Sequence, residues 1–252
     1  MARIELENMG LKFQVTSRGP LRLQDRLVRR LLPGLCVPAM EVHALRDIHL
    51  ELDDGDRIGI IGRNGSGKTT LLKVLADIYP PTSGTRRVRG RISSLFDIVL
   101  GFEMDATGWE NIAYRGYLQG ETPRSIRAKI DDVAEFSELG RYLDMPVRYY
   151  SAGMRIRLGF AISTAIDPDI LLVDEAFNAG DLAFRETARQ RIQAVLRKAR
   201  IVVAVSHDHE VLTSFCDHVL WLDEGRIRAV GPTRPMIAAY EADCSAAARP
   251  AA

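Results

Sequence analysis

The stretch GRNGSGKT at residues 62–69 has the residue types and the spacing needed to hold a polyphosphate. It fits the pattern G-x-x-x-x-G-K-[ST] and lies between an apolar strand-like segment, RIGII, and an apolar helix-like segment, KTTLLKVL. Glycines let the backbone wrap closely, so that successive N–H groups and the helix N-terminus face phosphate oxygens. We therefore predict a nucleoside triphosphate site that contains the residues Gly62, Arg63, Asn64, Gly65, Ser66, Gly67, Lys68, Thr69 and Thr70.

Within this loop, we expect the Lys68 amine to reach the β- and γ-phosphates and the Thr69 hydroxyl to bind Mg²⁺. The segment DILLVDE ends a second apolar strand, and its Asp174 is placed to hold the metal through water. Glu175 follows directly and is placed to orient or deprotonate an attacking water. Two carboxylates after an apolar strand are by themselves often an ordinary strand end, but together with the loop they predict triphosphate hydrolysis.

His207 follows a third apolar strand, IVVAVS, where an imidazole can donate a hydrogen bond to the γ-phosphate. A histidine at a strand end, taken without its neighbours, is more often structural. The run HDH at residues 207–209 has no carboxylate or cysteine cluster in the sequence to support a metal pair. We therefore place His207 with the phosphate-binding residues.

A second helix start built like an anion site occurs at residues 150–154, YSAGM. Ser151 is suited to be the N-cap, and Gly153 permits close approach of an anion to the positive end of the helix dipole. On its own, this pattern more often belongs to an ordinary N-capped amphipathic helix.

The elements around these motifs alternate between strand and helix. Apolar strands are expected at 48–52, 57–62, 170–175 and 201–206, with helices after residue 67 and at 183–199. This order predicts an α/β fold with a parallel sheet, and a mainly helical region at 103–165 is inserted in it. We also expect a strand pair or hairpin at 3–15, a closing hairpin at 218–230, a short helix at 234–241 and a frayed tail.

A segment at about 16–40 interrupts this order. Its leucines at positions 23, 27 and 31 are four residues apart with arginines between them, which predicts a short amphipathic helix that ends at Pro33. Such a helix fits either a position near a transport entrance or membrane surface, or a surface helix that covers the edge of the sheet.

Composition limits the classes of protein to consider. The 252 residues carry a formal net charge of +1, so no basic excess indicates binding to nucleic acid or an anionic membrane. Three cysteines without ligand spacing indicate free thiols in a reducing compartment. The N-terminus has no apolar core of a secretory signal, and the apolar runs are strand-sized. We expect a soluble cytosolic chain.

The order of these motifs resembles the ATPase subunit of ABC transporters. Lys68 and Asp174 are separated by the helical region, with the Ser-Ala-Gly helix start before Asp174 and His207 after it. The resemblance covers residues 3 to about 232. It implies a P-loop NTPase parallel-sheet core with an antiparallel β subdomain and an inserted helical subdomain. The implied boundaries are a single domain at 1–242 (core 1–96 and 166–242, helical subdomain at about 97–165) and a flexible tail at 243–252.

The resemblance also assigns roles. The family's signature motif, usually Leu-Ser-Gly-Gly-Gln, stands here as Tyr150, Ser151, Ala152, Gly153 and Met154. It implies that these residues bind the γ-phosphate held by a second copy, so that two chains enclose two ATP molecules head to tail. Asp181, in NAGD, matches the family's D-loop aspartate. Asp97, in FDIVLGF, stands where the family has a glutamine and is a candidate Mg²⁺ ligand. Either Phe13 or His43 is the candidate to stack on adenine, and either can instead pack in the core.

The chain looks like a member of one branch of that family. The features that resemble this branch are the variant YSAGM followed by RIRLGFAIS, the sequence FNAGD, and ALRDI after a long insertion. This branch exports lipid-linked polysaccharides such as O-antigen, capsule, teichoic acid and galactan across the inner membrane. The resemblance implies a separate membrane permease that contacts the glycan, and a peripheral position at the cytoplasmic face. Some members carry a C-terminal carbohydrate-binding domain, which we do not expect here because the sequence ends soon after its last helix.

Other classes share some of these motifs. A drug, lipid or other small-molecule ABC exporter differs only in the insertion and the YSAGM variant, and it remains the alternative. ABC proteins of DNA repair or translation carry coiled coils, zinc modules or a second ATPase unit, which this sequence lacks. GTPases and nucleotide kinases share the phosphate loop, but the guanine-reading Asn-Lys-x-Asp motif is absent and neither class explains residues 151–154.

Overall fold

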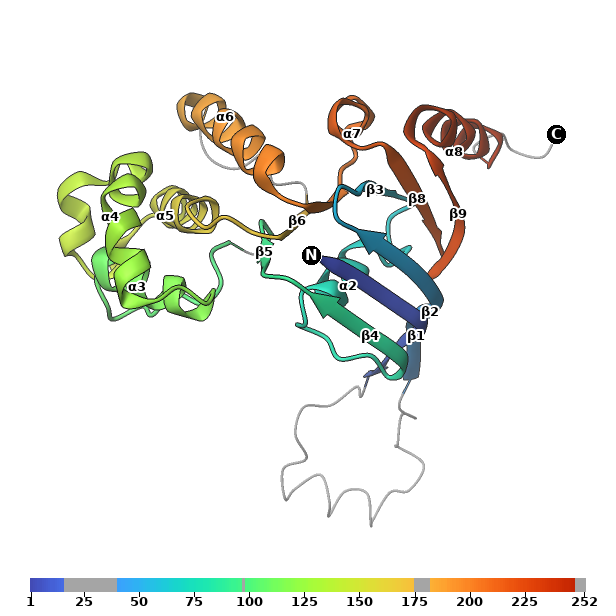
Figure 1. Cartoon of the computed structure of the whole chain (residues 1–252), viewed down its shortest axis with the longest axis horizontal. Coiled ribbons are helices and arrows are strands. Elements are labelled where there is room, and N and C mark those ends of the chain that lie inside the picture. Colours follow the sequence, from blue (N-terminus) through green and yellow to red (C-terminus); the bar gives the residue numbers. More distant parts are fainter. Residues whose placement is uncertain (16–39, 97, 175–181, 248–252) are drawn as a thin grey trace, which may run out of the picture.

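The computed structural model describes residues 1–15, 40–96, 98–174 and 182–247 (Figure 1). Three predicted site residues, Asp97, Glu175 and Asp181, lie outside the described residues, as does the amphipathic helix expected within 16–40.

The described residues form a six-stranded sheet that is parallel except at one edge. Strands β6 and β7 are almost continuously apolar because they are buried on both faces, as expected for the centre of a parallel sheet. In the order β5-β6-β7-β3-β8-β9, the strands are β5 (Ile92–Ser94), β6 (Ile170–Asp174), β7 (Ile201–Val205), β3 (Arg57–Ile61), β8 (His218–Asp223) and β9 (Arg226–Pro232). The predicted α/β fold with a parallel core is confirmed.

Helices cover both faces of this sheet. Side chains that alternate along each strand point to opposite faces, so each strand contributes to two cores. On one face, Ile58 and Val203 pack with α2 (Lys68–Leu75). On the other face, Val202 and Val219 pack with helices of the second half of the chain. Those helices are α6 (Leu182–Lys198), α7 (His209–Phe215) and α8 (Thr233–Ala247).

A three-stranded antiparallel sheet lies beside α2, in the order β2-β1-β4. Its strands are β1 (Arg3–Val15), β2 (Met40–Asp53) and β4 (Ser83–Arg89). The expected strand pair within 3–15 is wrong, because this segment is one strand. Asn8 has a φ of 48°, and the register with β2 shifts between Leu6 and Met9. This bulge breaks the apolar alternation without reversing the chain.

The segment between β5 and β6 forms a helical unit with its own core. Two of its helices begin with a capping box, in which the side chains of Thr107 and Thr122 accept hydrogen bonds from the backbone. The unit consists of α3 (Gly108–Leu118), α4 (Pro123–Ser137), two 3-10 turns (Gly140–Asp144 and Val147–Tyr149) and α5 (Ala152–Thr164). Its core includes Ile112, Val133 and Leu158, all with no exposed surface. In Figure 1, the helical unit lies to one side of the six-stranded sheet.

The last helix corrects a second expectation. Helix α8 continues through Ala247, so the flexible tail predicted for 243–252 does not begin at 243, and the short helix predicted at 234–241 is longer. The helix is fastened to the sheet by Tyr240, whose ring meets Trp221 edge-on at 5.3 Å, and by Asp243, which accepts a hydrogen bond from Arg228 at 2.8 Å. These contacts join residues distant in sequence, so the local composition of the tail did not indicate them.

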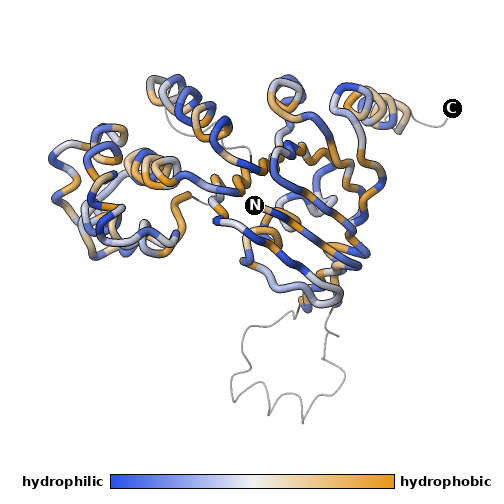
Figure 2. Tube along the Cα trace, viewed as in Figure 1, coloured by the Kyte–Doolittle hydropathy of each residue, from blue (hydrophilic) through white to orange (hydrophobic). Residues whose placement is uncertain are grey.

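The helices mix hydrophobic and hydrophilic residues along their length (Figure 2). Across the part of the chain that the structure describes, none of them combines the length and the apolar character required to span a bilayer.

Candidate functional site

The loop at 62–67 connects β3 to α2, and its shape depends on glycine. Gly67 is the N-cap of α2 with a φ of 105°, and a Cβ there would lie 2.9 Å from the Ala44 carbonyl oxygen. At Gly62, with a φ of 152°, a Cβ would lie 2.2 Å from the Leu222 carbonyl oxygen. A side chain at either position would collide with the backbone of a neighbouring strand, so the loop is held tightly between β2 and β8.

Lys68 is held inside its own loop. Its Nζ donates hydrogen bonds to the carbonyl oxygens of Gly62 at 2.7 Å and Arg63 at 3.1 Å, and the residue is 8% exposed. The Ser66 backbone joins the loop to the turn after β8, because its carbonyl oxygen accepts a hydrogen bond from the Gly225 N–H at 2.9 Å. The cation therefore lies in place above the start of α2, where phosphate oxygens would enter.

Thr69 and Asp174 meet although they are 105 residues apart. The Thr69 hydroxyl donates to the Asp174 Oδ2 at 2.8 Å, joining the first turn of α2 to the carboxyl end of β6. A hydroxyl and a carboxylate are hard oxygen donors of the kind that Mg²⁺ prefers, and they lie beside the loop that would hold the phosphates. The residues present thus fit a magnesium ion bound jointly with a nucleotide.

The loop opens into a cavity of about 510 Å³. Its walls bring together predicted site residues from four segments of the chain: His43, Lys68, Thr69, Asp174 and His207. His207 follows β7, next to β6 in the sheet, so the carboxyl ends of neighbouring parallel strands place it and Asp174 at one edge. The arrangement can hold a triphosphate against the start of α2 with a metal-binding pair on one side.

The two aromatic candidates for adenine occupy different environments. The Phe13 ring meets Tyr79 edge-on, with ring centroids 5.3 Å apart, and packs against the core under the antiparallel sheet. His43 lies on the neighbouring strand β2 and forms part of the cavity wall. Of the two, His43 is therefore the one that can reach a nucleotide bound in the cavity.

Ser151 and Gly153 lie elsewhere, at the exposed start of α5. The Ser151 Oγ accepts a hydrogen bond from the Met154 N–H at 3.2 Å, as an N-cap does. Within the described residues, a Cβ built on Gly153 would meet only the Ser151 Oγ, at 3.9 Å, so the helix is open at this position. Among the described residues that line the 510 Å³ cavity, none belongs to 150–154.

Tyr150, the residue before Ser151, is packed in the core of the helical unit and holds this helix start in place. It is 4% exposed, and its hydroxyl donates to the Tyr142 carbonyl oxygen at 2.7 Å. Burial is the main reason that the pKa of Tyr150 rises to about 12, with a smaller contribution from Asp144. The phenol therefore stays neutral at physiological pH and keeps its hydrogen bond.

Sequence motifs missed one side of the cavity. Arg46, Glu224 and Gly225 also line it, and the Arg46 N–H donates to the Gly225 carbonyl oxygen at 2.7 Å. Glu224 and Gly225 form the turn of the β8–β9 hairpin, with φ values of 44° and 77°. The Glu-Gly pair is a turn signal in the sequence, but only the register of β8 on β3 brings that turn to the phosphate loop.

A family model described as "ABC transporter" matches residues 45–178, just over half of the chain.

Curated relatives align over most of the chain. An O-antigen export system ATP-binding protein of Myxococcus xanthus is 44% identical over 199 residues, which is 79% of this chain and 46% of the relative. A protein of the same description from Yersinia enterocolitica is 36% identical over 90% of this chain and 97% of its own length. A teichoic acids export ATP-binding protein of Shouchella clausii is 39% identical over 86% of this chain and 60% of its own length. The chain thus spans about half of two of these relatives, 46% and 60%, and nearly all of the third.

Solved structures agree on the fold. A dimeric post-hydrolysis state of an ATP-binding cassette, bound to ADP and Pi, superposes with a TM-score of 0.67 over 92% of this chain and 99% of its own. Its sequence identity is 20%. A dimeric structure of a bacterial ABC transporter cassette gives the same TM-score, coverage and identity.

Proposed function

This chain belongs to the ABC transporter family, and we propose that within it the chain binds and hydrolyses ATP to power export of a lipid-linked polysaccharide through a separate membrane permease. The observation that carries the proposal is the match with the Yersinia enterocolitica O-antigen export protein, which extends over nearly the full length of both chains. The similarity to a teichoic acids export protein favours the same class of substrate, because both are envelope glycans.

Different residues of the cavity would bind different parts of ATP. The 62–70 loop and Lys68 hold the phosphates, with His207 near the γ-phosphate and His43 against the adenine. Thr69 and Asp174 would hold Mg²⁺, which when bound offsets the negative charge of the phosphates. By resemblance, Glu175 orients the attacking water and accepts its proton. The resemblance also makes Asp97 a metal ligand and Asp181 a nucleotide contact.

In a single chain, the helix start at Ser151 does not line the phosphate cavity. This separation supports a site that is completed by a second copy. Ser151, Ala152 and Gly153 at the N-terminus of α5 are exposed, and an exposed helix start is suited to an anion supplied from outside the chain. We infer that residues 151–154 of each copy bind the γ-phosphate held by the other, in a head-to-tail homodimer. ATP then favours the closed dimer because it binds that state more tightly than the open one.

The permease partner is expected on the helical unit. Helix α3 exposes large apolar side chains, including Tyr114 and Leu118, the latter 79% exposed. Contiguous exposed apolar residues are typical of a protein contact. Docking there would place the chain at the cytoplasmic face of the inner membrane, with the permease rather than this chain in contact with the glycan.

The test is a Glu175→Gln substitution in cells of the source organism, followed by extraction of lipid-linked glycans from cytoplasm and envelope. We expect the glycan to accumulate inside and to be lost from the surface, because ATP still closes the dimer but turnover stops. Glu135→Gln, an exposed position on α4, serves as the matched control and should leave export unchanged. Unaltered glycans in the Glu175→Gln strain would refute glycan export and make a small-molecule exporter the better hypothesis.

A further inference from the structure

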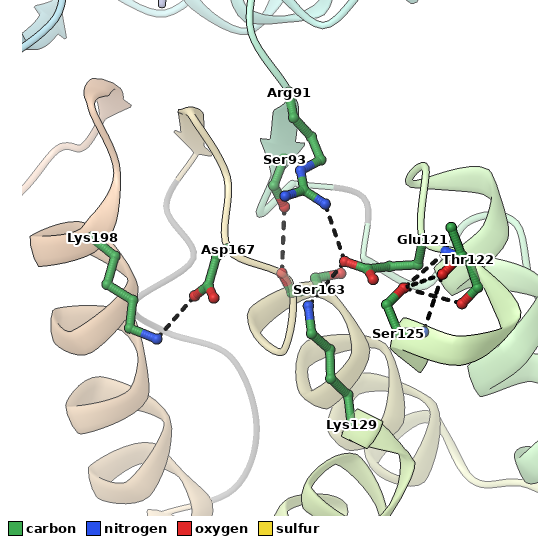
Figure 3. Close-up of polar contacts among 9 residues, drawn as sticks. All are labelled: Arg91, Ser93, Glu121, Thr122, Ser125, Lys129, Ser163, Asp167 and Lys198. Atoms are coloured by element: carbon green, nitrogen blue, oxygen red, sulfur yellow. Dashed lines mark hydrogen bonds and ion pairs between the residues drawn. The ribbon is translucent and has the colours of Figure 1, made fainter. Parts of the chain in front are cut away.

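A buried carboxylate lies where the helical unit meets the six-stranded sheet (Figure 3). Glu121 follows α3, and its side chain is only 4% exposed. Its Oε1 is 3.1 Å from Arg91 Nη1 and 2.9 Å from Lys129 Nζ, so a single oxygen accepts hydrogen bonds from two cations. Burying a carboxylate costs free energy unless it is paired in this way. The carboxylate is therefore stable in this position only while its two partners stay within hydrogen-bond distance.

The two cations belong to different parts of the molecule. Lys129 is on α4 and moves with Glu121 as part of the helical unit. Arg91 immediately precedes β5, and its backbone is fixed to the sheet: the Arg91 N–H donates to Asp169 Oδ2 at 2.9 Å, and the Arg91 carbonyl oxygen accepts from the Ile170 N–H at 2.9 Å. The Arg91–Glu121 pair therefore links the two parts, whereas the Lys129–Glu121 pair stays within one of them.

Apolar contacts also join the two parts. Phe136 of α4, Phe160 of α5 and Phe184 of α6 form an aromatic cluster with ring centroids 5.5 to 5.9 Å apart. Apolar contacts of this kind resist separation but constrain rotation weakly, because hydrophobic attraction has no preferred direction. A charge-assisted hydrogen bond at fixed distance constrains rotation more strongly.

Two further polar contacts cross between the parts: a bidentate ion pair of Arg191 on α6 with Asp132 on α4, and a hydrogen bond from Ser93 Oγ to the Ser163 carbonyl oxygen at 3.4 Å. The Arg91–Glu121 pair differs from both because its carboxylate is buried, so its loss leaves unpaired charge at the junction.

The carboxylate keeps its charge in this setting. Burial raises the pKa of Glu121, but the hydrogen bond from Ser125 and the charges of Lys129 and Arg91 together lower it below its ordinary value. The link thus operates as an ion pair at physiological pH.

We propose that the Arg91–Glu121 pair is a positioning link that fixes the orientation of the helical unit, and with it the Ser151–Gly153 helix start, relative to the phosphate loop. The orientation itself is a property of the single chain. Its effect on ATP-dependent dimerisation rests on the function proposed above, because a helix start held in one orientation loses less freedom when a second copy closes on it.

The first experiment measures orientation in the isolated chain without nucleotide. Spin labels at Ala128→Cys on α4 and Ser214→Cys on α7 report the distance between the two parts, after Cys36 and Cys244 are replaced by serine and Cys216 by alanine. We expect a distance distribution at least about twofold broader in Arg91→Gln and in Glu121→Gln than in the parent. Lys129→Gln is the matched control and should stay as narrow as the parent.

The second experiment measures ATP-dependent dimerisation in a Glu175→Gln background. We expect the dimer dissociation constant to rise about fivefold in Arg91→Gln, Glu121→Gln and the double variant alike, with the affinity of the single chain for ATP unchanged. The effects do not add because both substitutions remove the same link.

An equally narrow distribution in Arg91→Gln, or an equal broadening in Lys129→Gln, would overturn the positioning role. The Arg91 side chain is 42% exposed, so we expect Arg91→Gln to fold. If Glu121→Gln does not fold because it loses a buried carboxylate, Arg91→Gln still tests the link. If the parent fails to dimerise with ATP, the head-to-tail site is refuted, and the distance measurement still decides the role of the link.

Discussion

His43 and Phe13 lie on paired strands, yet they face different surroundings. His43 lines the cavity and Phe13 packs against Tyr79, so we expect the first to contribute to nucleotide binding and the second to stability. The sequence contains both aromatic residues before the phosphate loop but does not distinguish them, because the difference depends on which side of β1 and β2 each side chain occupies.

For His43→Ala, we expect the dissociation constant for ATP to rise about tenfold, since ring stacking on a base contributes about 1 to 1.5 kcal/mol. For Phe13→Ala, we expect the free energy of unfolding to fall by about 2 kcal/mol and the ATP dissociation constant to stay within about twofold. Titration with a fluorescent ATP analogue and urea unfolding of each variant give the two quantities. The reverse pattern would assign Phe13 to the adenine.

The contiguous motif could be predicted in detail, and residues contributed by distant segments could not. The glycines of residues 62–69 lie close together in the sequence, so the sequence predicts the close backbone turn found at Gly67. Arg46 and Glu224 reach the cavity only through strand pairing, and no local pattern marks them.

Among the elements, the apolar strands and capped helices were predictable from their periodicity. Where expectations failed, at β1 and α8, the cause was a contact with a distant element: β1 continues past its bulge because β2 pairs with it, and α8 continues because Trp221 and Arg228 hold it. Glu121 belongs to the same group, because neither of its partners is adjacent in sequence.

Glu121 also makes stability depend on pH. Since the pKa of Glu121 is lowered in the folded state, its contribution to stability is present above the unfolded pKa of about 4.5 and is lost as the pH falls through the folded pKa. We expect Glu121→Gln to lower the free energy of unfolding by about 1 kcal/mol at pH 7 and by progressively less below pH 4.5. Urea unfolding of parent and variant across pH 3 to 7 would show a constant difference if the carboxylate were not responsible.

The matched control for that series is Asp105→Asn. Asp105 pairs with Arg148 at 2.6 Å, but its side chain is 75% exposed. We expect its removal to change the free energy of unfolding by less than about 0.5 kcal/mol at any of these pH values.

At the scale of the whole molecule, the separation between the phosphate cavity and Ser151 predicts complementation between inactive chains. In the proposed head-to-tail dimer, Lys68→Ala would remove a phosphate ligand and Ser151→Ala would remove the N-cap hydroxyl offered to the other copy. We therefore expect each variant alone to have no ATPase activity above background. In a head-to-tail heterodimer of the two variants, each site combines the phosphate loop of one chain with the helix start of the other. One site therefore contains both substitutions, and the other site contains neither. An equimolar mixture should recover about a quarter of the parent activity, since half of the dimers are mixed and each has one of two sites intact.

ATPase activity of the mixture, measured against each variant alone at the same total protein concentration, checks this. A mixture as inactive as its components would show that a single chain must supply both residues to one site. Activity that exceeds half of the parent's would also contradict the arrangement.

Lys68 has a consequence for the speed of the cycle. Its ammonium donates hydrogen bonds to the carbonyl oxygens of Gly62 and Arg63, which belong to the same loop. These hydrogen bonds join the loop to itself through protein groups alone. We therefore expect the loop to keep its fold when a nucleotide leaves and to be folded already when the next one binds. Nucleotide exchange at this loop should accordingly follow ordinary diffusion of the nucleotide, and the slow event of the cycle should be the parting of the two chains rather than any refolding within one of them.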